Sequence, residues 1–196
     1  MTDDNPISPL GARAATLIPG LTEERYAAMV TVWARADAVA ATGAELGVAL
    51  PTVPGTAAVA GNRTVVWMGP EEWLVLDREV PPEDIIAATT AAAAAVDVTS
   101  QRIALRLRAP WARDVLAAGC AIDLHPSRFG AVDGAGPGVV SAVQTNLALA
   151  TVVVMANPPG DGERAGDDVT VLVRSTFCRY LVDWLADAAA EDLRTA

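Results

Sequence analysis

The chain has 196 residues, of which 52% are hydrophobic, 5% aromatic and 19% charged, and its formal net charge is −10. This length predicts one compact domain that buries roughly 70% of its unfolded surface. All 14 basic residues are arginine, which excludes Schiff-base chemistry and the lysine-dependent P-loop. One histidine and two cysteines are too few for a His- or Cys-rich metal site. The acidic balance argues against nucleic acid and an anionic membrane as main partners.

Targeting and membrane signals are not expected. The acidic N-terminus lacks the basic and apolar parts of a secretory signal, and two distant cysteines favour a reducing, cytoplasmic location. Residues 134–160 carry no charge, but Gln144 and Asn146 interrupt them and Gly/Pro clusters flank them. We therefore predict one or two buried strands here, and no membrane span.

The first part of the chain begins with residues 1–20, which we expect to form an extended arm because they contain three prolines. Thr22 is positioned to cap a helix that ends near Gly47. Its apolar residues recur at helical spacing, and they are Tyr26, Met29, Val30, Trp33 and Ala34. Two strands, Thr64–Met68 and Trp73–Leu76, follow around a Gly-Pro turn, and an alanine-rich helix is expected from Pro82 to Ala95.

The second part opens with the clearest strand, Gln101–Arg108, whose apolar residues alternate with others. The next expected elements are a helix from Pro110 to Gly119 and then the buried strands. A polar loop at Gly160–Asp168 and a strand at Val169–Val173 follow before the last helix. Ser175 is placed to cap that helix. Its apolar stripe contains Phe177, Tyr180, Leu181, Trp184, Leu185 and Ala188. This alternation predicts an α+β domain over residues 21–196, with helices packed on mixed or antiparallel sheets, and no internal repeat is visible.

No catalytic constellation is apparent in the sequence. His125 has no nucleophile motif nearby, so a structural role in its loop is favoured over acid–base catalysis. Cys120 and Cys178 fit small buried residues better than nucleophiles. The glycines at 130, 134, 136 and 138 lack the strand–loop–helix context of a phosphate loop.

The arginines of the strand 101–108 are its most distinctive polar feature. Arg102, Arg106 and Arg108 fall on one face together with Ala104. This face is either solvated or a docking surface for an acidic partner, because arginine pairs bidentately with carboxylates. Tryptophans leave a similar choice between core and interface. Trp33 and Trp184 fit core stripes, whereas Trp67, Trp73 and Trp111 lie near turns.

Several segments resemble the gamma subunit of heterotetrameric sarcosine oxidase. Trp67–Leu76 is similar to the family's W-x-G-P-[DE]-E-W-L-x-L signature, and Gly119–Pro126 to G-C-x-x-D-L-H-P. The other matching segments are Ser8–Leu10, Val96–Leu107, Val171–Phe177 and Tyr180–Leu185. Thr99-Ser100-Gln101 departs from the family's frequent Ser-His-Arg, and the region before Leu21 looks shortened.

The resemblance implies βαβ-type units related to the folate-binding aminomethyltransferase fold. It also implies a complex with alpha, beta and delta subunits that demethylates sarcosine oxidatively, giving glycine, peroxide and a one-carbon unit for tetrahydrofolate or release as formaldehyde. FAD, FMN, NAD and tetrahydrofolate are then expected in the partner subunits and no cofactor in this chain. A chain with one histidine and no lysine agrees with a non-catalytic role.

Two hypotheses therefore stay open. The first is a structural subunit whose interface, commonly above about 2,000 Å², includes the N-terminal arm and Gly69, Pro70, Glu71, Glu72, Trp73, Arg106 and Arg108. The second is a stand-alone folate-binding or aminomethyltransferase-like protein with Asp97 or Asp123 facing the substrate amine. Either aspartate can equally brace a turn, and fold relationship alone does not carry an activity across. The sequence does not specify which N-methyl amino acid is oxidised.

Overall fold

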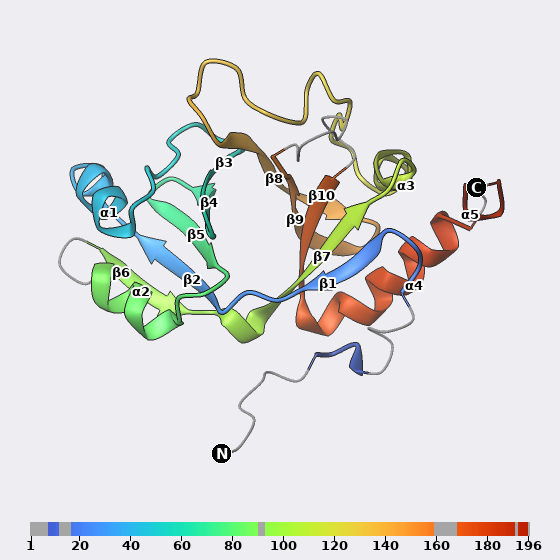
Figure 1. Cartoon of the computed structure of the whole chain (residues 1–196), viewed down its shortest axis with the longest axis horizontal. Helices are drawn as coiled ribbons and strands as arrows, with labels where there is room; N and C mark the ends of the chain where they lie inside the picture. Colours follow the sequence, from blue (N-terminus) through green and yellow to red (C-terminus); the bar gives the residue numbers. More distant parts are fainter. Residues whose placement is uncertain (1–7, 12–16, 90–92, 159–167, 191, 196) are drawn as a thin grey trace.

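A computed structural model describes residues 8–11, 17–89, 93–158, 168–190 and 192–195 of the chain. The described residues form one curled antiparallel sheet of ten strands with helices on its outer sides (Figure 1). The strand order is β1-β7-β10-β9-β8-β3-β4-β5-β2-β6. The strands are β1 Leu21–Glu24, β2 Ala28–Trp33, β3 Thr56–Ala60, β4 Arg63–Gly69, β5 Glu72–Asp77, β6 Ala94–Asp97, β7 Arg102–Arg108, β8 Val139–Leu147, β9 Ala150–Ala156 and β10 Asp168–Arg174. The helices are α1 Val39–Leu46, α2 Pro82–Thr89, α3 Ala112–Gly119, α4 Cys178–Ala188 and α5 Asp192–Thr195.

One long strand joins two halves of the sheet. Residues 139–141 of β8 pair with β3, whereas residues 142–147 pair with β9. We call β2 to β6 with α1 and α2 the first half, and β1 with β7 to β10, α3 and α4 the second half. Figure 1 shows α1 and α2 outside the first half and α3 and α4 outside the second.

The two halves repeat one topology. Each runs strand, helix, three strands, helix along the chain, and the sheet orders are β3-β4-β5-β2-β6 and β8-β9-β10-β7-β1. The last strand in each order is exchanged, because β1 precedes the first half in sequence but pairs with β7, and β6 precedes β7 but pairs with β2. Within the first half, β5–α2–β6 is a β-α-β unit split by β2.

The helix expected from Thr22 onward is wrong. Residues 21–24 and 28–33 form β1 and β2, and only residues 39–46 are helical before the left-handed cap at Gly47. β2 lies between β5 and β6 and is covered on both faces, so Met29 and Val30 are both buried and the alternation typical of a strand is hidden. Trp33, expected in a core stripe, is 41% exposed at the end of this strand.

Three later expectations also need correction. The helix that begins at Pro82 ends at Thr89, and residues 94–97 form the edge strand β6. Ser175 does not cap the last helix, since a 3-10 turn over Ser175–Phe177 leads into α4 and no side chain caps either element. Phe177 and Tyr180 belong to the expected apolar stripe but are 44% and 38% exposed. Most of the predicted polar loop before residue 168 lies outside the described residues.

The remaining predicted elements are confirmed. The two strands around the Gly-Pro turn, the alternating strand β7, helix α3 and β10 all form where the sequence placed them, within one or two residues. The charge-free residues 134–160, expected to hold one or two strands, form two, β8 and β9. All of the strand pairings between named strands are antiparallel. The fold is therefore α+β, as expected.

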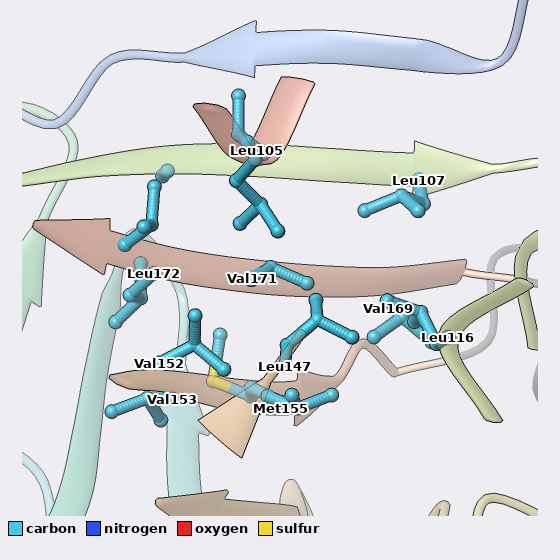
Figure 2. Close-up of a cluster of buried hydrophobic side chains, with 14 of the residues drawn as sticks. Leu105, Leu107, Leu116, Leu147, Val152, Val153, Met155, Val169, Val171 and Leu172 are labelled. Carbon is cyan, nitrogen blue, oxygen red and sulfur yellow. The ribbon is translucent and has the colours of Figure 1, made fainter. Parts of the chain in front are cut away.

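The second half holds the larger part of the core. Figure 2 shows Leu105 and Leu107 of β7 beside Val171 and Val169 of β10, which are their partners in the register. These side chains and Leu116 of α3 are almost completely buried. A separate cluster under α1 and α2 contains Val30, Val65, Trp73, Val75 and Ile85. Burial of this kind contributes about 1.5–3 kcal/mol per large side chain.

Part of the N-terminal segment packs on the second half. Leu10 is 1% exposed and belongs to the core cluster of the second half. Arg179 of α4 donates a hydrogen bond from Nε to the carbonyl oxygen of Pro9 at 2.7 Å. Residues 8–10 are thus attached to the body of the protein.

Candidate functional site

A hollow lies where the two halves meet. It has a volume of about 460 Å³ and is lined by the N-terminal segment, the β1–β2 connection, the turn before β7 and the turn after β10. Polar lining residues include Ser8, Glu23, Thr99, Arg102 and Ser175, and Tyr26 and Met29 supply apolar surface. The hollow is therefore assembled by the two connections that exchange strands between the halves.

Hydrogen bonds fix several of these lining groups. The Ser8 hydroxyl donates to Oε2 of Glu23 at 2.6 Å. Thr99 accepts the backbone N–H of Met29 at 3.0 Å and donates to Oδ1 of Asp97 at 2.6 Å. Burial raises the pKa of Tyr26, which keeps its hydroxyl neutral. These hydrogen bonds hold the side chains of Ser8, Glu23 and Thr99 in place at the hollow.

A chain of ion pairs runs beside this hollow. Arg106 of β7 donates from Nε to Oδ1 of Asp168 at 2.7 Å, from Nη2 to Oδ2 of the same residue, and from Nη1 to Oε1 of Glu24 at 3.0 Å. Oε2 of Glu24 accepts from Arg78 at 2.8 Å. The hydrogen bond to Asp168 raises the pKa of Arg106 further above its usual range. These contacts tie β1, β7 and β10 to the end of β5.

The predicted docking arginines are thus used in different ways. Arg106 is half-buried, and its guanidinium fork serves Asp168 and Glu24 within the chain. Arg108 is exposed at the end of β7, where its backbone N–H donates to the carbonyl oxygen of Gly20 at 2.7 Å. Their proposed contact with a partner stays a prediction.

The Gly-Pro turn between β4 and β5 has an unusual backbone. Pro70 and Glu71 are exposed, and Glu71 has a φ of 61°, a left-handed conformation that glycine or asparagine normally occupies. Trp73 lies behind the turn with 2% exposure, and its Nε1 donates to the carbonyl oxygen of Pro51 at 2.8 Å. The turn therefore presents Pro70 and Glu71, while Trp73 anchors it from inside.

The two candidate aspartates both brace turns. Asp97 accepts the backbone N–H and hydroxyl of Thr99, and Asp123 accepts the backbone N–H of His125 at 2.9 Å. Both are exposed, and neither lines the large hollow. The ring of His125 contacts Ser127 in the same loop, with 2.8 Å between Nδ1 and the hydroxyl oxygen.

Other reactive groups are placed in structural positions. Cys178 is fully buried at the start of α4, and burial raises the pKa of its thiol to about 12. Burial also raises the pKa of Cys120. Within the described ranges, no three His, Cys, Asp or Glu side chains come together in a way that could hold a metal ion. In the same part of the chain, no helix has the length and hydropathy of a membrane span.

Sequence reasoning missed the acidic partners of the arginines. Glu24 lies two residues after Thr22, inside the helix expected there, and Asp168 ends the expected polar loop, so the sequence indicates no special role for either. Arg174 was missed as well, although it faces Arg102 across the β7–β10 pair. Of these three residues, only Arg174 could have been singled out from the sequence, because it is a charged residue directly after the apolar run Val171–Val173.

Comparisons with known proteins agree across most of the chain. The model of the "Sarcosine oxidase, gamma subunit family" matches residues 30–191. Sarcosine oxidase subunit gamma of Corynebacterium sp. (strain U-96) is 34% identical over 157 residues, which cover 78% of this chain and 69% of that protein. The subunit gamma from Arthrobacter sp. is also 34% identical over 157 residues, covering 78% of this chain and 70% of that protein.

A solved structure extends the similarity to the fold. A chain of the heterotetrameric sarcosine oxidase from Corynebacterium sp. U-96, in complex with pyrrole 2-carboxylate, matches with a TM-score of 0.76 at 29% identity. The match covers 94% of both chains. The signature around the β4–β5 turn, the family model and these relatives agree. The chain belongs to the sarcosine oxidase gamma subunit family.

Proposed function

We propose that this chain is a non-catalytic assembly subunit of a heterotetrameric sarcosine oxidase, with alpha, beta and delta subunits as its partners. The observation that carries the proposal is the match to a chain of such a heterotetramer over 94% of both chains. The reaction of the complex is the oxidative demethylation of sarcosine to glycine, with the one-carbon unit transferred to tetrahydrofolate. FAD, FMN, NAD and tetrahydrofolate belong to the partner subunits in this proposal, and the complex is cytoplasmic.

The chemistry of the large hollow supports a role in binding. Two carboxylates near it, Glu23 and Glu24, are held by Ser8 and by Arg78 and Arg106. Both carboxylate oxygens of Glu24 accept hydrogen bonds from arginines, Oε2 from Arg78 and Oε1 from Arg106. The arginine-bound Glu24 is thus better suited to holding strands together than to acid–base catalysis.

The exposed turn between β4 and β5 is the proposed centre of the partner interface. Holding Glu71 at a positive φ costs on the order of 1 kcal/mol, and such cost is found preferentially at functional positions. We include Gly69, Glu72 and Arg108 as flanking contacts, with Arg106 and Trp73 supporting them from within. Residues 1–20 act as an arm on the single domain 21–196, because Leu10 is already anchored in the core.

The repeated topology supports the proposed relation to the folate-binding aminomethyltransferase fold. A duplicated unit with exchanged edge strands is compatible with descent from a larger ligand-binding domain. The hollow of about 460 Å³ is large enough for part of a small ligand. The alternative is a stand-alone folate-binding or aminomethyltransferase-like protein. The lining of the hollow favours the assembly role over this alternative, because neither Asp97 nor Asp123 is part of the lining.

The test is co-expression of this chain with the large subunits encoded by its host, followed by purification through a tag on this chain. A yellow complex with flavin absorbance, which fails to form when this chain is omitted, is the expected result. A colourless monomer would contradict the assembly role. That monomer should then be titrated with tetrahydrofolate, using Asp97→Asn and Asp123→Asn as variants, to test the alternative.

A further inference from the structure

Two arginines of the second half oppose each other across neighbouring strands. Arg102 begins β7, Arg174 ends β10, and the antiparallel register pairs them directly. Side chains at such a pair lie about 5 Å apart at Cβ, and like charges there destabilise the sheet. Within the described residues, neither arginine forms a salt bridge with a carboxylate.

The neighbouring arginines do not share this arrangement. Arg106, on the same face of β7, is neutralised by Asp168 and Glu24. Arg78, which follows the end of β5 as Arg174 ends β10, has Glu24 at 2.8 Å. Arg102 donates only to the amide oxygen of Gln101 at 3.0 Å among the contacts of the described chain. Unlike Arg106 and Arg78, Arg102 and Arg174 therefore have no salt bridge within the described residues.

A small hollow lies between the two arginines. Its volume is about 70 Å³, its floor is formed by the buried Val153 and Leu172, and its rim by Arg102, Arg174 and Gln144. Gln144 is held in place because Nε2 donates to the carbonyl oxygen of Met68 at 2.7 Å. A water molecule occupies roughly 30 Å³ in the liquid, so the hollow accepts a group of a few heavy atoms, such as a carboxylate.

The half-buried position of Arg102 adds to the cost of the pair. Burial lowers the pKa of Arg102, and the charge of Arg174 lowers it further, while the charge of Glu72 opposes both. Arg102 also lines the hollow of about 460 Å³, so the two hollows adjoin at this residue. An incoming negative group would relieve the repulsion and meet up to two guanidinium forks.

We propose that Arg102 and Arg174 together bind the carboxylate of an acidic side chain from another subunit of the oxidase. This inference rests on the proposed function. The hollow is too small for a nucleotide or a folate, and Arg174 is exposed, so the acidic side chain reaches it from outside. A charge pair between subunits contributes to subunit affinity and to correct docking.

The experiment compares the co-expressed complex containing wild-type chain with complexes containing Arg174→Gln or Arg102→Gln. Arg35→Gln is the matched control, because it removes the same charge from an exposed pair with Asp37. Dissociation of the chain from the complex is measured at low and high salt. We expect about 10-fold weaker binding for either test variant, a weaker salt dependence, and no change for the control.

The stability of the free chain distinguishes a binding role of the two arginines from a structural one. Removal of one like charge from the pair should leave the melting temperature of Arg174→Gln unchanged or higher. Titration of the free chain with acetate, followed by NMR of the arginine side chains, should show saturable shifts that the variant lacks. Lower stability in Arg174→Gln would overturn the inference, since the pair would then stabilise the fold.

The outcomes separate this inference from the proposed function. Wild-type and variant chains that assemble equally would overturn the inference while the assembly role stands. Acetate binding without any effect on assembly would also overturn it, because the carboxylate would then come from a free small acid. A wild-type chain that never assembles would overturn the proposed function and, with it, the partner assigned here.

Discussion

The two halves share one topology but place their charges on opposite sides of the sheet. In the first half, the pair between Arg63 and Asp77 lies on the face of β4 and β5 that also carries Val65 and Val75, toward α1. In the second half, Arg106 lies on the face of β7 opposite Leu105, and it shares this face with the buried Ala104. The topology accepts either arrangement. The ion pairs of Arg106 are thus not required by the topology, which makes their surroundings a candidate for contact with partners.

Substitutions in the cores of the two halves should have the largest effect on the free energy of unfolding. Leu105 and Val30 are fully buried at the centres of β7 and β2. We expect Leu105→Ala to lower the free energy of unfolding by about 3 kcal/mol and Val30→Ala by about 2 kcal/mol, because the leucine leaves the larger cavity. Urea denaturation of the free chain, followed by circular dichroism, measures both.

The same experiment asks whether the halves unfold together. Because β8 pairs with strands of both halves, one transition is expected for each variant. Hydrogen exchange that speeds up only in β7 to β10 after Leu105→Ala would show instead that the halves are separate cooperative units. Leu149→Ala, at an 83% exposed position, is the control and should change little.

The buried acid of the first half predicts a pH dependence. Asp77 is 2% exposed and accepts hydrogen bonds from the backbone N–H groups of Glu79 and Val80 and from Arg63. Burial alone would raise its pKa, but these bonds to the charged form outweigh burial and lower it below the ordinary 3.8. We expect Asp77→Asn to cost about 2 kcal/mol at pH 7.

The direction of the pH effect follows from this lowered pKa. The stabilisation by Asp77 is complete above the pKa of the unfolded chain, about 3.9, and is lost as the pH falls through the folded value. The difference in melting temperature between wild type and Asp77→Asn should therefore shrink below pH 4. A difference that stays constant down to pH 2 would contradict the assigned charge.

A glycine ends the first helix of each half, for different reasons. A Cβ at Gly119 would lie 2.4 Å from the ring of Trp184 and 2.9 Å from Leu147, whereas Gly47 has open space but a φ of 68°. Gly119→Ala should thus cost about 2 kcal/mol through overpacking, and Gly47→Ala about 1 kcal/mol through backbone strain. Adding Trp184→Phe to Gly119→Ala should restore part of the stability that Gly119→Ala loses, whereas adding it to Gly47→Ala should restore none. Thermal denaturation measures both.

The sequence predicts elements that carry a strong local signal. The β4–β5 hairpin follows from its Gly-Pro turn, and β7 from its alternation, since each signal is local. β1 and β6 were missed because each is an edge strand with a single partner that is distant in the sequence, β7 for β1 and β2 for β6. The residues of both strands also fit a helical pattern. The exchange of edge strands also hides the repeat, because it depends only on pairings between distant segments.

The site was predictable to a similar extent. The period of two predicted the arginine face of β7, and the docking role expected for it stays a prediction. Which arginines are already neutralised could not be read from the sequence, since the acidic partners of Arg106 come from β1 and β10. Arg174 joins Arg102 only through the sheet register.

The smallest effect concerns one strained turn residue in each half. Glu71 has a φ of 61° and Ala148, at the β8–β9 turn, a φ of 52°. Both conformations are unfavourable for side chains with a Cβ, so Glu71→Gly and Ala148→Gly should each raise the free energy of unfolding by up to about 1 kcal/mol. If the β4–β5 turn contacts a partner, only Glu71→Gly should also weaken assembly. Melting temperatures of the free chains and dissociation of the complexes measure both parts, and equal assembly of the two variants would leave the strain at Glu71 without a functional reason.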